Sequence, residues 1–257
     1  MPLSDHENQA LQESVRQLRK DIVDVTFWAG GAHIGGALSM AEILVILYDR
    51  FLNIDPARPD WPERDRVVLS KGHAGVGYAP LLARKGYDSL KVKGVDVSTG
   101  SLGHGLPLAA GLALGARVQQ QSWRTYCILG DGECNEGTIW EAAMAISHYR
   151  LTSVITFVDR NKYCVDGATE EVMGIEPLAD KWKAFGFGVL EVDGHSFAAL
   201  DDAIRAAQAA DVPVVIIAHT IKGKGVDFME DDVKWHYGGL DSDSLARAKA
   251  SIEKSGT

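Results

Sequence analysis

The chain has 257 residues, with 26 lysines and arginines against 35 aspartates and glutamates, so its formal charge is −9. This acidic balance disfavours a protein whose partner is a nucleic acid or an anionic membrane surface. A hydrophobic fraction of 46% with 24% charged residues is typical of a folded chain with a buried core. At this length we expect a single domain over residues 1–257.

Export signals and a cysteine framework are both missing from the sequence pattern. The first twenty residues are polar and mixed in charge, and the longest apolar run, residues 212–218, is too short to span a bilayer. Cys127, Cys134 and Cys164 form no C-x-x-C pair, which argues against disulfides and a thiolate zinc site. We therefore expect a cytoplasmic protein.

The first third of the chain predicts three helices and one strand. Apolar residues at helical spacing predict an amphipathic helix over about 5–28 that packs on the rest of the domain. Ser39 and Glu42 form a capping-box pattern, which predicts a second helix over about 40–52. Residues 66–70 are a candidate strand, 71–74 a turn, and 74–85 a third helix.

The second half alternates between strand and helix patterns. Short apolar or β-branched runs predict strands at 125–129, 153–159, 189–192 and 212–218. Helical periodicity lies between them at 137–149, 178–185 and 197–210, and again at 242–254. This alternation indicates an α/β fold, in which a parallel sheet is flanked by helices on both faces.

A glycine-flanked acid follows the predicted strand at 125–129. Gly130 and Gly132 allow close approach to the backbone, and the following helix can offer N–H groups to a phosphate. Asp131 beside a phosphate calls for a divalent cation, and Asn161, after the next strand, can supply a second oxygen ligand. A lone G-D-G is more often a simple turn. The combination with Asn161 instead predicts a diphosphate held through Mg²⁺.

Six segments give the chain a resemblance to the transketolase family, and specifically to the N-terminal subunit of a split transketolase. The resemblance spans nearly the whole sequence and implies the thiamine diphosphate-binding fold (PP domain). It rests on GAHIGGALSMAEIL (31–44), DRVVLSKGHA (65–74), VSTGSLGHGL (97–106), LGDGECNEGTIWEAA (129–143), VDRNKYCVDG (158–167) and TIKGKGVDFMEDDVKWH (220–236).

The resemblance implies a set of site residues. The side chains of Asp131 and Asn161 and the main-chain carbonyl of Tyr163 would hold the metal, Mg²⁺ or Ca²⁺. The catalytic histidines would be His33, His73 and His236, whose charged forms a bound diphosphate would favour. The residues that would bind thiamine diphosphate are His73, Gly100, Leu102, Gly132, Glu133, Asn161 and His236.

Other polar residues within and between these segments are interpreted separately. Glu136 matches an acid at the subunit contact of the family, whereas His104 replaces a glutamine of the family pattern, which leaves its role open. The KGKG run at 222–225 lacks the spacing of a P-loop and is expected to be a solvated loop or lid. Lys91 and Lys93 are expected to be solvated loop charges rather than substrate contacts.

The sequence departs from the family at two places. Only thirteen residues separate Gly86 from Gly100, and they lack the His-Pro-Glu or His-Pro-Asp motif of the family. This departure predicts an unusual ketose donor, such as a branched sugar phosphate or a sulfonated sugar. The pyrimidine-binding domain with its activating glutamate is also missing, which implies a C-terminal partner subunit in an α₂β₂ assembly.

Two other functions remain compatible with the sequence. The G-D-G and Asn pattern is shared with 1-deoxyxylulose-5-phosphate synthase-like enzymes and with dehydrogenase E1 α subunits, although the SKGHA and KGKGV…WH segments favour transketolase. The chain could also be a non-catalytic cofactor-binding module.

Overall fold

The structure is a computed structural model that describes residues 2–87, 94–97 and 99–255. Its centre is a five-stranded sheet in the order β1-β2-β3-β5-β4, in which every neighbouring pair is parallel. The strands are β1 (Arg66–Leu69), β2 (Thr125–Gly130), β3 (Val154–Arg160), β4 (Gly188–Asp193) and β5 (Val214–His219). All five predicted strands are confirmed to within about two residues at each end.

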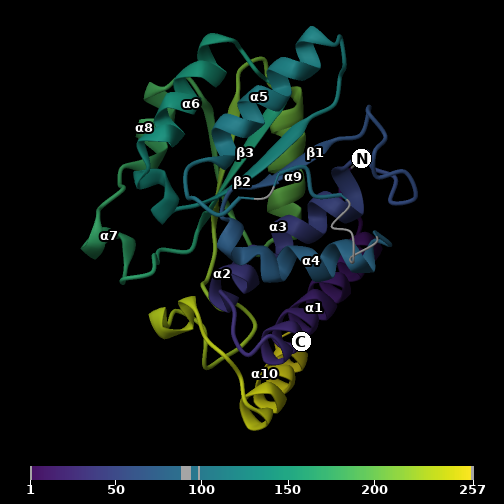
Figure 1. The fold of residues 1–257 in the computed structure, drawn as a ribbon, viewed down its shortest axis with the longest axis vertical. Coiled ribbons are helices and arrows are strands. Elements are labelled where there is room, and N and C mark those ends of the chain that lie inside the picture. Colours follow the sequence, from purple (N-terminus) through teal and green to yellow (C-terminus); the bar gives the residue numbers. More distant parts are fainter. Residues whose placement is uncertain (1, 88–93, 98, 256–257) are drawn as a thin grey trace.

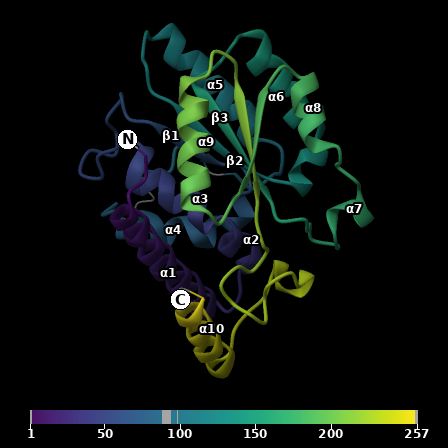
Figure 2. The same ribbon diagram turned by 180° about the vertical axis from the view of Figure 1, so that it is seen from behind.

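Helices cover both faces of the sheet, as Figures 1 and 2 show from opposite sides. Successive residues of β2 point to opposite faces: Cys127 and Leu129 belong to one buried cluster, and Tyr126 and Ile128 to the other. The first face is covered by α5 (Gly105–Val118), α6 (Gly137–His148) and α8 (Leu178–Ala184). Because both faces are covered, β2 and β3 are buried along their whole length.

The second face carries the N-terminal helices. The amphipathic helix predicted at the N-terminus is α1 (Asp5–Trp28), and it packs against α3, α4 and α10. The helices on this side are α1, α2 (Ile34–Ser39), α3 (Ala41–Ile46), α4 (Gly75–Arg84), α9 (Phe197–Ala209) and α10 (Ser242–Lys254). A short helix, α7 (Thr169–Val172), stands away from the sheet at the edge of the molecule (Figure 1).

The predicted helix over about 40–52 is present as α3 and the π-helical turn that follows it directly, but the capping box expected at its start is not. The chain is already helical in α2, breaks at Met40, continues in α3 and ends in a π-helical turn at Leu47–Phe51. The expected capping box is absent because both of its side chains have other partners. Ser39 donates to Asp159 Oδ2 at 2.6 Å, and Glu42 is paired with Arg19 at 2.7 Å. Buried tertiary contacts here outweigh a local capping signal.

The sequence patterns did not predict α5. Its sequence, GLPLAAGLALGARV, is almost entirely apolar and small, so no polar face marks a helical period. The helix packs on β1, β2 and α6. Even so, no helix within the described residues is both long and apolar enough to span a membrane.

The central strand should dominate the stability of this fold. Phe157 lies in β3 and is fully buried, so Phe157→Ala should lower the free energy of unfolding by about 3–5 kcal/mol in urea denaturation. Val118→Ala, at the exposed end of α5, is the control and should change it by no more than about 0.5 kcal/mol. Equal losses in the two variants would contradict the central place of β3.

Candidate functional site

A cavity of about 410 Å³ lies at the carboxyl ends of the strands. Residues that follow β1, β2, β3 and β5 line it, as expected for a parallel sheet. The structure brings every site residue predicted from the sequence to this one cavity: His33, His73, Gly100, Leu102, Asp131, Gly132, Glu133, Asn161, Tyr163 and His236.

Asp131 lies at the end of β2 and is almost fully buried. Its Oδ1 accepts the Gly132 N–H at 2.7 Å, and its Oδ2 accepts from the Lys162 N–H at 2.6 Å and from Arg160 Nη1 at 3.0 Å. Burial and the neighbouring Asp159 raise the pKa of Asp131 in spite of these donors. A carboxylate in this position gains from a further cation beside it.

Asn161 has a side-chain orientation that suits a ligand. Its Nδ2 donates to Asp159 Oδ2 at 3.1 Å, and a carboxylate can only accept. The amide oxygen therefore faces the other way and accepts the N–H of Tyr163 at 3.1 Å. Among the described residues no cluster of three His, Cys, Asp or Glu could bind a metal ion. A metal in this cavity would therefore need amide and carbonyl oxygens beside Asp131.

Beneath the cavity, Lys71 forms a buried ion pair with Asp159. Burial alone would raise the pKa of Asp159, but the Lys71 ammonium and the hydrogen bonds to this carboxylate together outweigh burial and lower that pKa. Asp159 also accepts from the hydroxyls of Ser39 and Thr220, and Lys71 donates to the Gly36 carbonyl at 3.0 Å. The pair therefore connects β1, β3, α2 and the segment after β5.

Lys222 corrects the expectation that the KGKG run is solvated. The side chain is buried, lines the cavity, and places its Nζ 2.9 Å from His236 Nδ1. Burial and the nearby Lys71 lower the pKa of Lys222 to about 8. The cavity therefore contains a second ammonium group. The sequence analysis did not predict it, because the KGKG run lacks the spacing of a P-loop.

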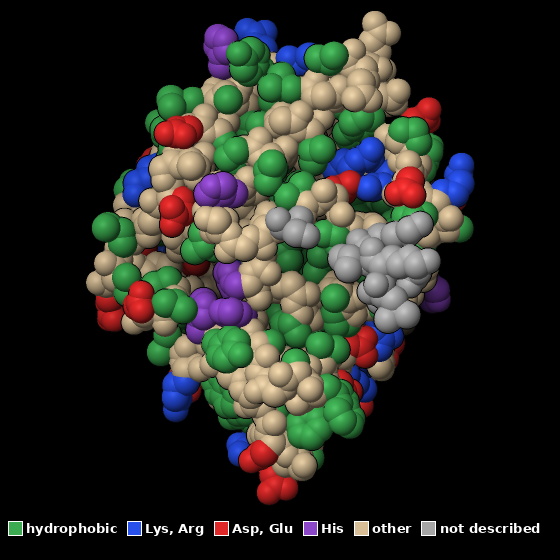
Figure 3. All heavy atoms as spheres, in the orientation of Figure 1, with side chains coloured by type: hydrophobic (Ala, Val, Ile, Leu, Met, Phe, Trp, Pro, Cys, Tyr) green, Lys and Arg blue, Asp and Glu red, His purple; other side chains and the backbone are tan. Residues whose placement is uncertain are grey.

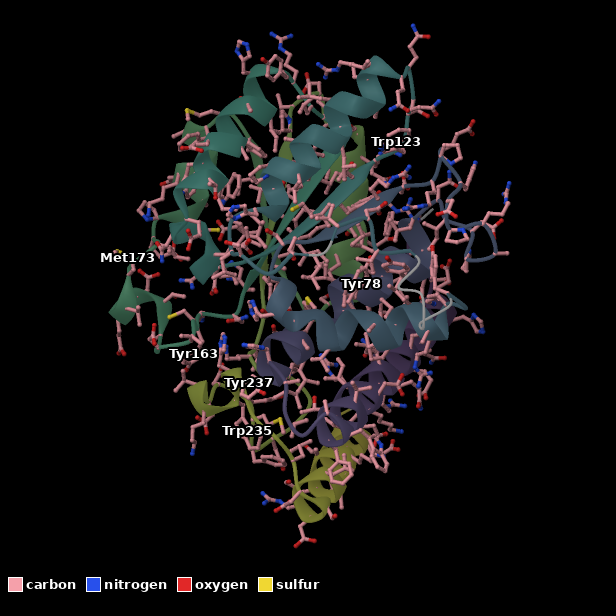
Figure 4. All side chains as sticks on the ribbon, viewed as in Figure 1. Tyr78, Trp123, Tyr163, Met173, Trp235 and Tyr237 are labelled. Atoms are coloured by element: carbon pink, nitrogen blue, oxygen red, sulfur yellow. The ribbon has the colours of Figure 1, made fainter. Side chains whose placement is uncertain are left out.

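The three predicted histidines form one cluster. His73 and His236 are stacked with ring centroids 5.4 Å apart, and the His33 ring lies 5.3 Å from each of them. Tyr237 packs edge-on against His33 at 5.0 Å. Histidine side chains gather on this face between α2 and the segment that precedes α10 (Figure 3), and the sticks place Tyr237 beside Trp235 there (Figure 4).

The surroundings of these imidazoles favour their neutral forms. Burial and nearby cations lower the pKa of His73 to about 3, and among the cations Lys71 has the largest effect. Burial and nearby cations also lower the pKa of His236 to about 3, and there Lys222 has the largest effect. Burial and Lys222 also lower the pKa of His33. These effects act against the predicted effect of a bound diphosphate, which would favour the charged forms.

Glu133 uses its carboxylate to hold the cavity wall together. One oxygen accepts from the Ser70 hydroxyl and from the Gly103 N–H at 2.8 Å, and the other accepts the Gly130 N–H at 3.0 Å. Burial raises the pKa of this carboxyl. Its contacts join the ends of β1 and β2 to the loop before α5, which indicates a positioning role.

The remaining residues singled out in the sequence lie at the margin or outside the described chain. His104 is exposed before α5, does not line the cavity, and has its Nδ1 3.0 Å from the Leu102 carbonyl. Glu136 is exposed at the start of α6. Lys91 and Lys93 lie outside the described residues.

The histidine cluster is assembled from both ends of the chain. An antiparallel bridge joins Ala32 to Gly238, which places His33 beside His236. A Cβ on Gly35 would lie 2.6 Å from the Trp235 carbonyl oxygen, so this close approach requires glycine.

His195 is a further residue that the sequence patterns did not predict. Its Nε2 accepts the Ile221 N–H at 2.8 Å, and its Nδ1 lies 3.2 Å from Glu42. It therefore fixes the backbone just before Lys222. The sequence signal for it is the DGH run that begins at the last residue of β4.

Comparisons with known proteins identify chains that are similar to this one over most of its length. The family model "Transketolase, thiamine diphosphate binding domain" matches residues 7–93 and 88–254. The chain is 40% identical to a 6-deoxy-6-sulfo-D-fructose transketolase subunit of Clostridium sp. (strain MSTE9), over 96% of this chain and 97% of that protein. It is 38% identical to one of the subunits of apulose-4-phosphate transketolase from Phocaeicola vulgatus, over 90% and 89%.

A solved structure gives the same fold over nearly the whole chain. Transketolase from Campylobacter jejuni superimposes with a TM-score of 0.88 at 28% identity and covers 97% of this chain. The chain spans only 43% of that transketolase.

The lowered histidine pKa values predict an acid-sensitive site. His73 is neutral in the fold down to a pH of about 3 but takes up a proton near pH 6.5 when unfolded, so its contribution to stability is complete above pH 6.5 and is lost as the pH falls toward 3. His73→Asn should therefore lose less stability than the wild type between pH 7 and pH 4.5, measured as denaturant midpoints. His148→Asn, exposed on α6, should behave as the wild type. Equal losses for wild type and His73→Asn would contradict this linkage.

Proposed function

We propose that this chain, which belongs to the transketolase family, is the cofactor-binding subunit of a two-chain transketolase. In this function residues 1–257 form one thiamine diphosphate-binding domain, and the complex transfers a two-carbon ketol unit from a ketose to an aldose. The observation that carries the proposal is the cavity at the carboxyl ends of the strands. Asp131 and Asn161 lie there together with three clustered histidines and two buried lysines.

The residues that line the cavity fit a metal-bound diphosphate. The Asp131 carboxylate, the Asn161 amide oxygen and the Tyr163 carbonyl would hold the metal, and oxygen ligands of this kind suit Mg²⁺ or Ca²⁺. Lys71 and Lys222 bring positive charge to the same cavity, which offsets the charge of a diphosphate. Gly132 has no side chain, which allows Cys164 to pack closely against it: a Cβ on residue 132 would lie 3.0 Å from Cys164 Cβ.

In the proposed mechanism the histidines act on the donor sugar. When bound, thiamine diphosphate supplies the nucleophilic carbon and the electron sink for breaking the C2–C3 bond of the ketose. A neutral imidazole offers one N–H donor and one acceptor, so His33, His73 and His236 can bind hydroxyl groups and move a proton between them. The Lys222 ammonium donates to Nδ1 of His236, which leaves the His236 proton on Nε2.

The proposed partner is a C-terminal subunit that carries the pyrimidine-binding domain and its activating glutamate, in an α₂β₂ complex. Three observations support a partner. Relatives of the same length are named as subunits, and the chain spans less than half of a full transketolase. Exposed apolar side chains also line the cavity or directly follow one of its lining residues in the sequence, and exposed apolar patches mark interaction sites. They are Leu102, Val165, Val172, Met173 and Tyr237.

The proposed donor is an unusual anionic ketose. Two relatives of matching length carry names that specify a sulfonated fructose and apulose 4-phosphate. The sequence lacks the His-Pro-Glu motif between Gly86 and Gly100, which in the family helps to hold the ordinary donor. A non-catalytic cofactor-binding module is the second candidate, and the next experiment separates the two.

Removing the metal ligand should abolish the activity of the complex. Asp131→Ala should lower two-carbon transfer by the chain assembled with its partner by more than about 100-fold and weaken Mg²⁺-dependent binding of thiamine diphosphate. Asp211→Ala, at an exposed loop position, is the control and should leave both unchanged. Unchanged turnover in Asp131→Ala would overturn the catalytic role, and a wild-type complex that binds cofactor without any turnover would favour the non-catalytic module.

The donor proposal predicts a distinct substrate profile. The complex should turn over apulose 4-phosphate or 6-deoxy-6-sulfo-D-fructose at least about tenfold better, by kcat/KM, than xylulose 5-phosphate, a difference of about 1.4 kcal/mol. The chain purified alone should show no transfer with any of the three. Xylulose 5-phosphate turnover as efficient as that of a standard transketolase would refute the unusual donor, and transfer by the lone chain would refute the need for a partner.

A further inference from the structure

Arg160, at the end of β3, uses two edges of its guanidinium group to join the inside of the molecule to its surface. On the inner edge, Nη1 donates to Asp131 Oδ2 at 3.0 Å and to Thr169 Oγ1 at 2.7 Å. On the outer edge, Nη2 donates to Glu170 at 3.1 Å and to Glu176 at 2.9 Å, and Nε reaches Glu176 at 3.2 Å. The Arg160 side chain is only 5% exposed, whereas those of Glu170 and Glu176 are 45% and 52% exposed.

The two glutamates belong to an outer segment, residues 162–176, that includes α7. This segment projects from the sheet edge at the α7 label in Figure 1, yet its residues Cys164 and Val172 line the cavity. It is held in shape by a bridge between Tyr163 and Ala168 and by a bond from Asn135 Nδ2 to the Met173 carbonyl at 3.2 Å. The outer segment is thus one wall of the proposed metal end of the cavity.

The glutamates also organise the backbone of this wall. Glu170 Oε1 accepts the Ile175 N–H at 3.2 Å, and Glu176 Oε2 accepts the Leu178 N–H at 2.8 Å. Each carboxylate therefore binds Arg160 and a backbone N–H near the end of the outer segment. Without these carboxylates, the outer segment would lose two backbone hydrogen bonds, and the outer edge of the Arg160 guanidinium group would lose its hydrogen-bond acceptors.

The charges of these residues also connect the outer segment to Asp131. An arginine remains protonated in proteins, so Arg160 opposes a divalent cation on Asp131 unless its charge is shared. The carboxylates of Glu170 and Glu176 partly neutralise the positive charge of Arg160. Without them, Arg160 would bind Asp131 more strongly and compete with a metal ion for the same carboxylate.

We propose that Arg160 is a positioning residue that couples the exposed carboxylates of Glu170 and Glu176 to Asp131, so that the outer segment sets how well the cavity holds its metal and diphosphate. This inference rests on the proposed function, because it takes Asp131 as a metal ligand. It assigns a role in cofactor binding to two half-exposed side chains that do not line the cavity.

The test uses the double variant Glu170→Gln/Glu176→Gln in the complex with its partner subunit. The Mg²⁺ concentration that half-saturates thiamine diphosphate binding, followed by tryptophan fluorescence, should rise about five- to tenfold, within the range known for residues that support metal ligands. Glu171→Gln is the matched control, since Glu171 is an exposed neighbour with no side-chain hydrogen bond or ion pair within the described chain. It should stay within about twofold of the wild type.

A second measurement on the chain alone does not depend on cofactor. Amide hydrogen exchange in residues 162–176 should be faster in the double variant and in Arg160→Lys, which keeps the charge but loses the two-edged geometry, and unchanged in Glu171→Gln. Wild-type-like Mg²⁺ dependence or wild-type-like exchange in the double variant overturns the coupling. A wild-type complex that binds no thiamine diphosphate overturns the proposed function and, with it, the metal-related role, while exchange still decides whether Arg160 holds the segment.

Discussion

The ion pair between Lys71 and Asp159 lies beneath the cavity, and most of the site is arranged around it. Two charges removed from water are tolerated only when they are close together and their remaining hydrogen-bonding groups are satisfied. Asp159 meets this condition with Ser39, Thr220 and Asn161, and Lys71 meets it with the Gly36 carbonyl. These partners come from separate elements. The hydrogen bonds that satisfy this one buried pair therefore hold the carboxyl ends of the strands in a fixed position against α2.

The alignment extends to groups that do not touch the pair. Asn161 is oriented through its bond to Asp159, which directs the amide oxygen away from that carboxylate. Lys71 also lowers the pKa values of His73 and Lys222 by direct repulsion, in addition to their burial. The cavity thus carries ammonium groups beside neutral imidazoles, an arrangement in which a bound anion would stabilise the lysines and raise the histidine pKa values at once.

The parts of the fold that the sequence predicted are those with a local signal. Residues 125–129 and 153–159 read as strands because central strands of a parallel sheet are continuously apolar, and the G-D-G sequence directly after the first of them located Asp131. α5 had no such signal, since an apolar helix made of small residues shows no polar period.

Side chains whose partners lie far along the sequence could not be predicted from local pattern. Ser39 is an example: its capping signal gives way to a bond with Asp159, 120 residues away in sequence. Lys222 is another, because a lysine between glycines resembles a solvated loop until the fold buries it against His236. For Arg160 nothing in the order of residues shows that one side chain joins Asp131 to two surface glutamates.

The bridge between Ala32 and Gly238 has a consequence for how the protein is made. A ribosome synthesises the chain from its N-terminus, so His33 and His73 emerge early and lack their neighbour His236 until the segment that carries Lys222 and His236 has left the exit tunnel. Nascent or prematurely terminated chains lack the wall that closes the histidine cluster. A ligand that needs this wall therefore binds only chains that have been synthesised past Gly238.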